Sequence, residues 1–247
     1  MTRKLAIVLA GFAAAIVAVF LFHPAPFRQP LAYHRFADTR AWAGIPNTLN
    51  VVSNAGFLAV FGAWLFARTE RSVAERTFFL GIFLTSIGSS YYHLSPSNAT
   101  LPWDRLGMAI AFMALLAILV RAPLAWLAAF QGFGIAAVVI SGVYDDLRLY
   151  GVAQFYPVLV LLILIEGWLW AAGAAYAIAK VCEQFDAQIF QTLDVVSGHT
   201  LKHLFAAAGI YFIWRWLRSR PGSARQISAC RNIAGTLRSA RRAAMNG

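Results

Sequence analysis

Apolar residues gather into runs of roughly twenty along this chain of 247 residues, and short polar or charged stretches separate the runs. A run of that length crosses the roughly 30 Å hydrocarbon layer of a bilayer as a helix. Lipid offers the backbone no hydrogen-bonding partner, so each crossing segment must satisfy its own N–H and C=O groups. The pattern therefore predicts an all-α fold, a multipass membrane helical bundle.

The runs divide into eight expected membrane segments. The stretch from Ala153 to Val181 is too long for one ordinary crossing, so we divide it at Glu166-Gly167 to Ala172-Gly173 into two short helices. Polar stretches, including Glu183 to Asp194, are expected to be connections. The other six segments are Leu5 to Phe22, about Asn47 to Ala67, Thr77 to Leu94, Trp103 to Arg121, Pro123 to Val143 and Val195 to Leu217.

The first segment fits either a signal peptide or a retained helix. Its apolar run is longer than a usual signal-peptide core, and His23 to Phe27 offers a poor cleavage site. We favour the retained helix. Residues 1–27 are then an N-terminal membrane anchor, 28–217 form the main membrane domain, and 218–247 form a basic cytoplasmic tail that is expected to be disordered.

The composition agrees with a membrane protein, and much of its net positive charge lies in the C-terminal tail. Hydrophobic residues make up 60% of the chain and charged residues 13%, a balance that one soluble core could not bury. A formal net charge of +11 would fit nucleic-acid binding, but eight arginines lie between Arg215 and Arg242 with no acidic residue among them. Such a tail is typical of a cytoplasmic segment on anionic lipid headgroups, so no nucleic-acid partner is expected.

The distribution of basic residues predicts an orientation in the cell membrane. With eight segments and both termini cytoplasmic, the cytoplasmic side receives Arg3-Lys4, the Arg68 to Arg76 loop, Arg121 and the tail, as the positive-inside rule requires. Two cysteines, Cys182 and Cys230, lie far apart without CxxC spacing. Neither is expected to be a metal ligand or a disulfide partner.

Two histidines near the start of the last segment carry the clearest chemical signal. His199 and His203 are four residues apart, so on a helix they share a face and can bind one metal ion. Ionisable groups at membrane depth are costly and mark functional sites. His93 is the best third ligand, and Asp104 follows it by eleven residues. The count of segments puts all four residues on the non-cytoplasmic side.

Three neutral imidazoles with one open position describe a catalytic zinc site that activates water. Asp104 is placed to move a proton, and Ser89, one helical turn before His93, can donate to a developing oxyanion. Membrane histidines can instead hydrogen-bond between helices or line a proton path. Lys202, between the two histidines of the last segment, either snorkels toward the interface or touches a polar headgroup.

A polar stripe runs along the second segment. Asn50, Ser53 and Asn54 fall at i, i+3 and i+4 on an otherwise apolar helix. Interhelical hydrogen bonding and support of a catalytic site explain the stripe equally well.

The combined motifs resemble the alkaline ceramidase (alkaline phytoceramidase) family. This family belongs to a superfamily of seven-helix membrane hydrolases that includes the adiponectin receptors. The similarity covers roughly Tyr33 to Leu217, and its motifs are Asn50-xx-Ser53-Asn54, Ser89-xxx-His93, Asp104 and His199-xxx-His203.

The resemblance implies a seven-helix core with one extra N-terminal transmembrane helix. It also implies that His93, His199 and His203 hold zinc while Asp104 and Ser89 assist attack on an amide. The implied substrate is a ceramide-like lipid that enters from the bilayer and is cleaved to a long-chain base and a fatty acid. Where the relatives have aromatics in the last motif, this chain has Thr200-Leu201-Lys202.

The resemblance further implies a calcium site in an acidic N-terminal segment. In the corresponding stretch this chain offers Asp38 and Asn47 among the basic residues Arg35 and Arg40. Calcium prefers six to eight oxygens, usually with several carboxylates. Calcium at Asp38 and Asn47 is therefore a weaker expectation than zinc.

Three function classes follow from these patterns. The first is a zinc amide hydrolase acting on an N-acyl lipid. The second is a receptor or sensor that binds a lipid or a metal without turnover. The third is a proton-coupled transporter in which Glu166, Lys180 and the histidines form a relay.

Overall fold

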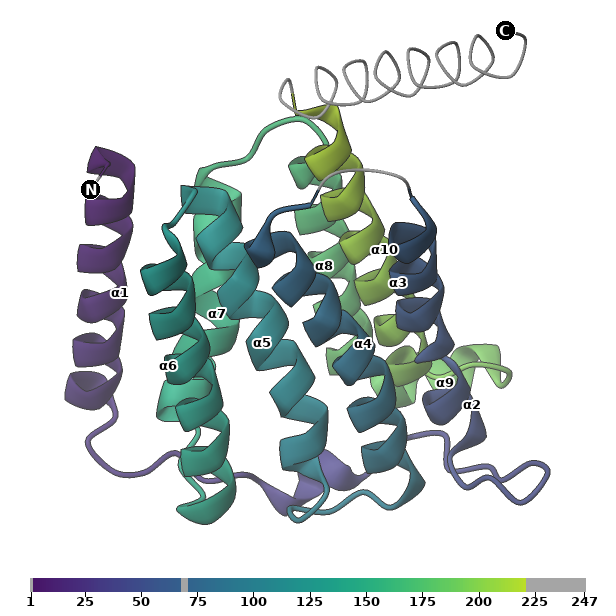
Figure 1. Cartoon of the computed structure of the whole chain (residues 1–247). Coiled ribbons are helices and arrows are strands. Elements are labelled where there is room, and N and C mark those ends of the chain that lie inside the picture. The colour runs from purple at the N-terminus through teal and green to yellow at the C-terminus, as the bar shows by residue number, and fades with distance from the viewer. Residues whose placement is uncertain (1, 68–70, 221–247) are drawn as a thin grey trace, which may run out of the picture.

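The computed structural model describes residues 2–67 and 71–220, and these residues fold into helices without a strand (Figure 1). The all-α prediction is confirmed. The helices are α1 (Arg3–Phe22), the 3₁₀ helix η1 (Leu31–His34), α2 (Thr48–Val52), α3 (Ala55–Phe66), α4 (Val73–Leu94), α5 (Leu101–Val120), α6 (Leu124–Val143), α7 (Arg148–Ile163), α8 (Leu169–Gln184), α9 (Asp186–Leu193) and α10 (Gly198–Ser219). The expectations for residues 221–247, including Cys230, lie outside the described residues.

Several helices are long and apolar enough to cross a membrane. They are α1, the stretch Thr48–Phe66 that combines α2 and α3, α5, and α6, and α7 is a shorter apolar helix. Their length and composition make the chain compatible with a membrane protein.

Helix α5 forms the centre of the bundle. It packs against α4, α6 and α7, and Met113, Ala114 and Leu116 on it are fully buried. α10 packs against α8 on one side and α3 on the other, and α3 in turn packs on α4. α1 lies at the edge against α7, where the Tyr156 hydroxyl donates to the carbonyl of Val8 at 2.6 Å.

Glycines allow α4 and α5 to approach closely. A Cβ added at Gly88 would collide with the backbone carbonyl of Trp103, and one added at Gly107 would collide with the backbone of Thr85. Small residues let membrane helices pack backbone to backbone in this way. The end of α4, which carries Ser89 and His93, is thereby held against the start of α5.

The second expected segment is interrupted. Ser53 Oγ donates to the carbonyl of Asn50 at 3.1 Å, and Asn54 Nδ2 donates to the same carbonyl at 2.9 Å. Side chains of this kind compete with the backbone ladder. Two helices, α2 and α3, therefore stand where one from Asn47 to Ala67 was expected.

Two other boundaries differ from the sequence-based expectation. α7 and α8 are separate helices, as expected, but α8 already begins at Leu169, after a turn in which Gly167 has a φ of +49°. Within residues 183–194, where a connection was expected, α8 continues to Gln184 and α9 covers Asp186–Leu193. Asp186 in its first turn complements the helix dipole.

We predict that Gly88→Val separates α4 from α5 and lowers thermal stability, because the Trp103 carbonyl is backbone and cannot move aside. Overpacking of this kind costs about 1–3 kcal/mol. The unfolding temperature in detergent measures the effect. Gly132→Val is the matched control, because nothing lies within 4 Å of a Cβ at that helical glycine. Equal unfolding temperatures for the two variants would contradict the prediction.

Candidate metal centre

Three histidines from two helices meet in the interior. His93 comes from the last turn of α4, and His199 and His203 come from the first turns of α10. Their exposed fractions are 1%, 4% and 3%. The ring centroids lie 4.8, 5.0 and 4.9 Å apart, so the rings form a nearly equilateral triangle. One ligand atom from each ring lies within 4.8 Å of the others, and the three can hold a metal ion.

The spacing of the ring nitrogens fits a tetrahedral ion. His199 Nε2 lies 3.3 Å from His93 Nε2. Two nitrogens that are each bound at about 2.0–2.1 Å in tetrahedral geometry stand about 3.3–3.4 Å apart. A direct hydrogen bond between these two rings would have a similar length. It would not explain why the ring of His203 lies equally close to both. The common distance and burial of all three rings favour the metal interpretation.

A hydrogen bond orients His203. Its Nδ1 lies 2.7 Å from Ser53 Oγ, and Ser53 itself donates to the Asn50 carbonyl. The hydroxyl oxygen therefore accepts from Nδ1–H, which leaves Nε2 with its lone pair free. Partners of this kind fix the tautomer and the angle of metal-binding histidines.

The polar stripe both connects helices and supports the histidines. Asn50 Oδ1 accepts from Thr200 Oγ1 at 2.9 Å, and Asn50 Nδ2 donates to the carbonyl of Asp38 at 3.2 Å. Asn50 and Asn54 are fully buried. These contacts confirm interhelical hydrogen bonding, whereas support of a catalytic site stays a prediction.

Asp186 fixes the start of α10 and was not singled out from the sequence. Its Oδ1 accepts from the backbone N–H of His199 at 2.7 Å, and its Oδ2 accepts from the N–H of Ala37 at 2.9 Å. Gly198 packs so closely on the carbonyl of Cys182 that no Cβ fits there. An acidic residue thirteen positions before the HxxxH motif was a visible signal in the sequence, but the backbone groups that it binds were not.

Phe36 covers one side of the triad. Its ring centroid lies 4.7 Å from that of His93 and 4.4 Å from that of His199. Asn47 Nδ2 donates to the carbonyl of His93 at 2.8 Å. The segment between η1 and α2 therefore closes the site and keeps water from this side of the rings.

The two residues expected for calcium have different contacts. Both carboxylate oxygens of the buried Asp38 accept from Arg40, at 2.8 and 2.9 Å, and these hydrogen bonds lower the pKa of Asp38. Asn47 is used at His93. Arg40 thus already supplies a cation to Asp38, and calcium stays a prediction that these contacts do not support.

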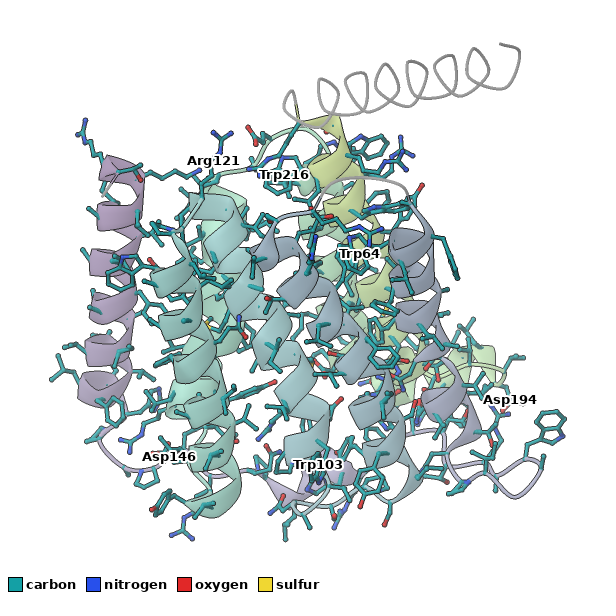
Figure 2. The ribbon with its side chains drawn as sticks, viewed as in Figure 1. Trp64, Trp103, Arg121, Asp146, Asp194 and Trp216 are labelled. Carbon is teal, nitrogen blue, oxygen red and sulfur yellow. The ribbon has the colours of Figure 1, made fainter. Side chains whose placement is uncertain are left out.

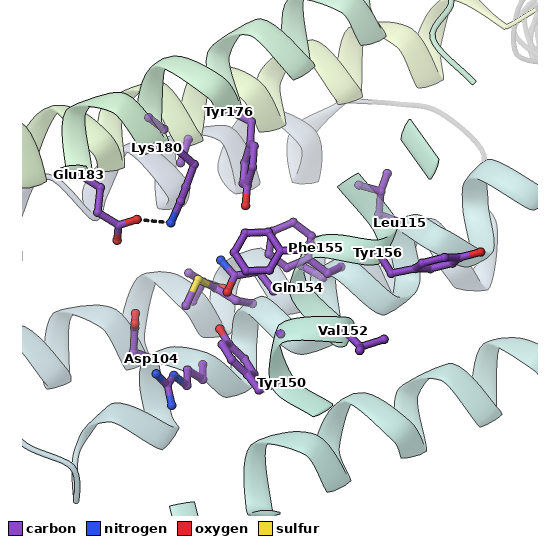
Figure 3. A pocket seen from close by; sticks show the side chains of 18 of the residues that line it. Asp104, Leu115, Tyr150, Val152, Gln154, Phe155, Tyr156, Tyr176, Lys180 and Glu183 are labelled. Atoms are coloured by element: carbon purple, nitrogen blue, oxygen red, sulfur yellow. Dashed lines mark hydrogen bonds and ion pairs between the residues drawn. The ribbon is translucent and has the colours of Figure 1, made fainter. Parts of the chain in front are cut away.

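Ser89 and Asp104 reach the same cavity as His203. The cavity has a volume of about 790 Å³ and a mainly apolar lining. The side chain of Asp104, from the first turn of α5, projects into it (Figure 3). Ser89 and Asp104 are both buried, with exposed fractions of 2% and 6%. Asp104 and Ser89 therefore share one cavity with His203, the member of the triad that lines it.

Lys202 forms an ion pair inside the protein. Its Nζ lies 3.1 Å from Glu183 Oε1, and Glu183 Oε2 pairs with Lys180. All three residues line the cavity. The sequence reading did not single out Glu183.

Glu166, expected in a proton relay, lies away from the histidines. It accepts from Trp216 Nε1 at 3.0 Å, in the last turns of α10, whereas the histidines occupy the first turns. The relay expected for a transporter is therefore not assembled by these contacts.

Comparison with protein-family models, with curated proteins and with solved structures finds no match to this chain. The class of protein is therefore defined by fold and site alone. It is a helical protein compatible with a membrane, in which three buried histidines can hold a metal ion beside an apolar cavity.

We predict about one metal ion per purified chain and its loss in His203→Ala. Ser53→Ala is expected to keep the stoichiometry but to weaken affinity about 10–100-fold, because the Nδ1 partner is gone. Elemental analysis and chelator competition measure both effects. The exposed His23 supplies the control, His23→Ala. Equal metal content in His203→Ala and His23→Ala would contradict the assignment.

We also predict an acid-dependent contribution of Asp38 to stability. Because its pKa is lowered in the folded chain, the ion pair stabilises fully above the unfolded pKa of about 3.9, and this is lost as the pH falls through the folded value. The difference in unfolding temperature between wild type and Asp38→Asn is expected to be constant above about pH 5 and to shrink below about pH 4. A difference independent of pH would argue against the pair.

Proposed function

We propose that this protein is a zinc-dependent intramembrane amide hydrolase of the alkaline ceramidase type. It cleaves an N-acyl, ceramide-like lipid to a long-chain base and a fatty acid. The observation that carries the proposal is that the histidine triad adjoins, through His203, an apolar cavity that Asp104 and Ser89 also line. The cavity volume of about 790 Å³ suits a lipid-sized ligand, since ligand pockets span about 300–1,000 Å³.

His93, His199 and His203 would hold the ion through ring nitrogens in a buried, low-dielectric site. Bound zinc supplies Lewis acidity, which polarises a carbonyl and activates water at neutral pH. Asp104 accepts a proton from the attacking water and returns it to the amide nitrogen as the C–N bond breaks. Ser89 donates to the carbonyl oxygen as charge develops on it.

The arrangement of the helices supports a membrane orientation. In the proposed topology α2 with α3, α4, α5, α6, α7, α8 and α10 form a seven-helix core, and α1 is the additional anchor helix. The termini are cytoplasmic and the metal site faces the non-cytoplasmic side. Arg121 and Trp216 lie at one end of the bundle, whereas Trp103 and Asp146 lie at the other (Figure 2). This distribution agrees with the positive-inside rule.

The remaining parts of the proposal concern lipid contacts. The substrate enters laterally from the bilayer, because an N-acyl lipid is already dissolved there. Anionic headgroups bind the basic residues of the C-terminal tail, most of which lie outside the described residues. Neither contact involves nucleic acid.

The test compares Asp104→Asn with wild type for fatty acid released from a pool of N-acyl lipids, with zinc content measured on the same samples. Asp104→Asn is expected to keep zinc and to lose about 100-fold or more in kcat, because the proton carrier is gone. Ser89→Ala is expected to lose less. Asp194→Asn, a carboxylate at the end of α9, is the matched control.

Each outcome separates the function classes. If the wild type contains zinc but releases no fatty acid, the protein is a receptor or sensor and the hydrolase proposal is wrong. Full activity of Asp104→Asn would remove the proposed proton carrier. If the wild type contains no zinc, the histidines serve in hydrogen bonding between helices or in proton conduction.

A further inference from the structure

Three charged side chains line the cavity as a cluster, and two of them, Lys180 and Glu183, lie opposite Asp104 in Figure 3. Lys180 and Glu183 are one turn apart on α8, and Lys202 comes from α10. We call these residues the lysine cluster. Lys180 pairs with one carboxylate oxygen of Glu183, and Lys202 pairs with the other at 3.1 Å. One carboxylate thus serves two ammonium groups, which leaves one positive charge in excess.

The other charges on the cavity do not remove this excess. Arg148 also lines the cavity, but its guanidinium is paired at 2.6 Å with Asp146, so it adds no unpaired charge. Arg105 and Asp104 both line the cavity and have opposite charges, so together they add no net charge to it. The excess therefore belongs to the lysine cluster, beside walls that are mainly apolar. An uncompensated charge in such surroundings is costly, and an anionic ligand group would relieve the cost.

The lysines remain accessible to a ligand. The exposed fractions of the Lys180, Lys202 and Glu183 side chains are 40%, 18% and 20%. Lys180 Nζ lies 5.8 Å from the ring centroid of Phe155, another cavity residue. A cation beside an aromatic and apolar surface suits a ligand that has both an oxyanion and a hydrocarbon chain.

We infer that the lipid amide taken by this cavity carries an oxyanion at its polar end, as an N-acyl amino acid does, and that Lys180 and Lys202 bind it. This inference rests on the proposed function for hydrolysis of the amide. It differs from the ceramide-like substrate in the amine that is released, which here carries the anionic group. Hydrolysis of such a substrate breaks the C–N bond. Water supplies the hydroxyl of the released fatty acid and the proton on the released amine.

The test uses two ligands that differ by one charge, N-palmitoylglycine and N-palmitoylglycinamide. Binding is measured to the full-length, zinc-loaded chain in a non-ionic detergent. The wild type is expected to bind N-palmitoylglycine about tenfold more tightly, the effect of one charge-assisted hydrogen bond. Two equal affinities would overturn the inference.

Charge variants test whether the lysine cluster causes the preference. Lys180→Gln is expected to reduce it to about twofold or less, Lys180→Arg to keep it, and Glu183→Gln to increase it because a second ammonium group loses its partner. Lys202→Gln repeats the test on α10. Lys4→Gln is the matched control, because Lys4 lies on α1 outside the cavity. A preference that none of the cluster variants changes would place the carboxylate elsewhere and overturn the inference.

A third ligand, palmitate, separates substrate from product. If palmitate binding depends on Lys180 while the glycine and glycinamide ligands bind equally, the cluster holds the fatty-acid product and the inference is wrong. Zinc content and unfolding temperature are measured for each variant. If a lysine variant misfolds, Glu183→Gln takes its place in the test. This variant removes a negative charge, so the preference for N-palmitoylglycine is expected to increase.

Hydrolysis of the same two amides separates this inference from the proposed function. Equal kcat/KM and equal affinity for both amides would support the hydrolase and overturn the anion preference. A binding preference that depends on Lys180, without any hydrolysis, would overturn the hydrolase and keep the anion site.

Discussion

Hydrogen bonds that join the start of α10 to the α2–α3 segment and to α9 hold the histidines in place. Ser53 binds His203, Asn50 binds Thr200, and Asp186 binds the backbone of His199. Each of these polar groups would be costly in a low-dielectric interior without its partner. The need to satisfy them fixes the rotation and depth of α10 against the rest of the bundle. The triangle of imidazoles is a consequence of that constraint.

The close packing of α4 on α5 supplies the other half of the site. With glycine at position 88, the two backbones nearly touch, and Ser89 and Asp104 reach one cavity. A larger residue at this contact would shift Asp104 relative to the histidines on α10. Proton transfer and oxyanion stabilisation both depend on placement within hydrogen-bond distance, so this contact belongs to the chemistry as well as to the fold.

Electrostatics divides the interior into two regions. At the triad, His203 has an oriented lone pair and Phe36 covers the rings, which suits a metal cation. Along the cavity wall, Lys180 and Lys202 share the single carboxylate of Glu183, which suits an anion. A lipid amide with a charged polar end would use both regions at once. Arg40, bound to Asp38, meanwhile supplies the positive charge that calcium would bring to that segment.

The sequence by itself determined the helical class and much of the site. Runs of about twenty apolar residues allow only helices in lipid. The spacing of His199 and His203 put both on one face, and the order of segments put His93 and Asp104 at the same end. These inferences succeeded because periodicity and segment length are local properties that a chain carries without its partners.

The tertiary structure decided everything that depends on which distant groups meet. It broke the second segment at Ser53 and Asn54, where side chains bond to the backbone, and it made a helix of residues 186–193. It paired Lys202 with Glu183, nineteen residues earlier in the chain, and placed both side chains on a cavity wall. A hydrogen bond or an ion pair between residues far apart in the chain depends on distance and burial, and both exist only once the helices have packed.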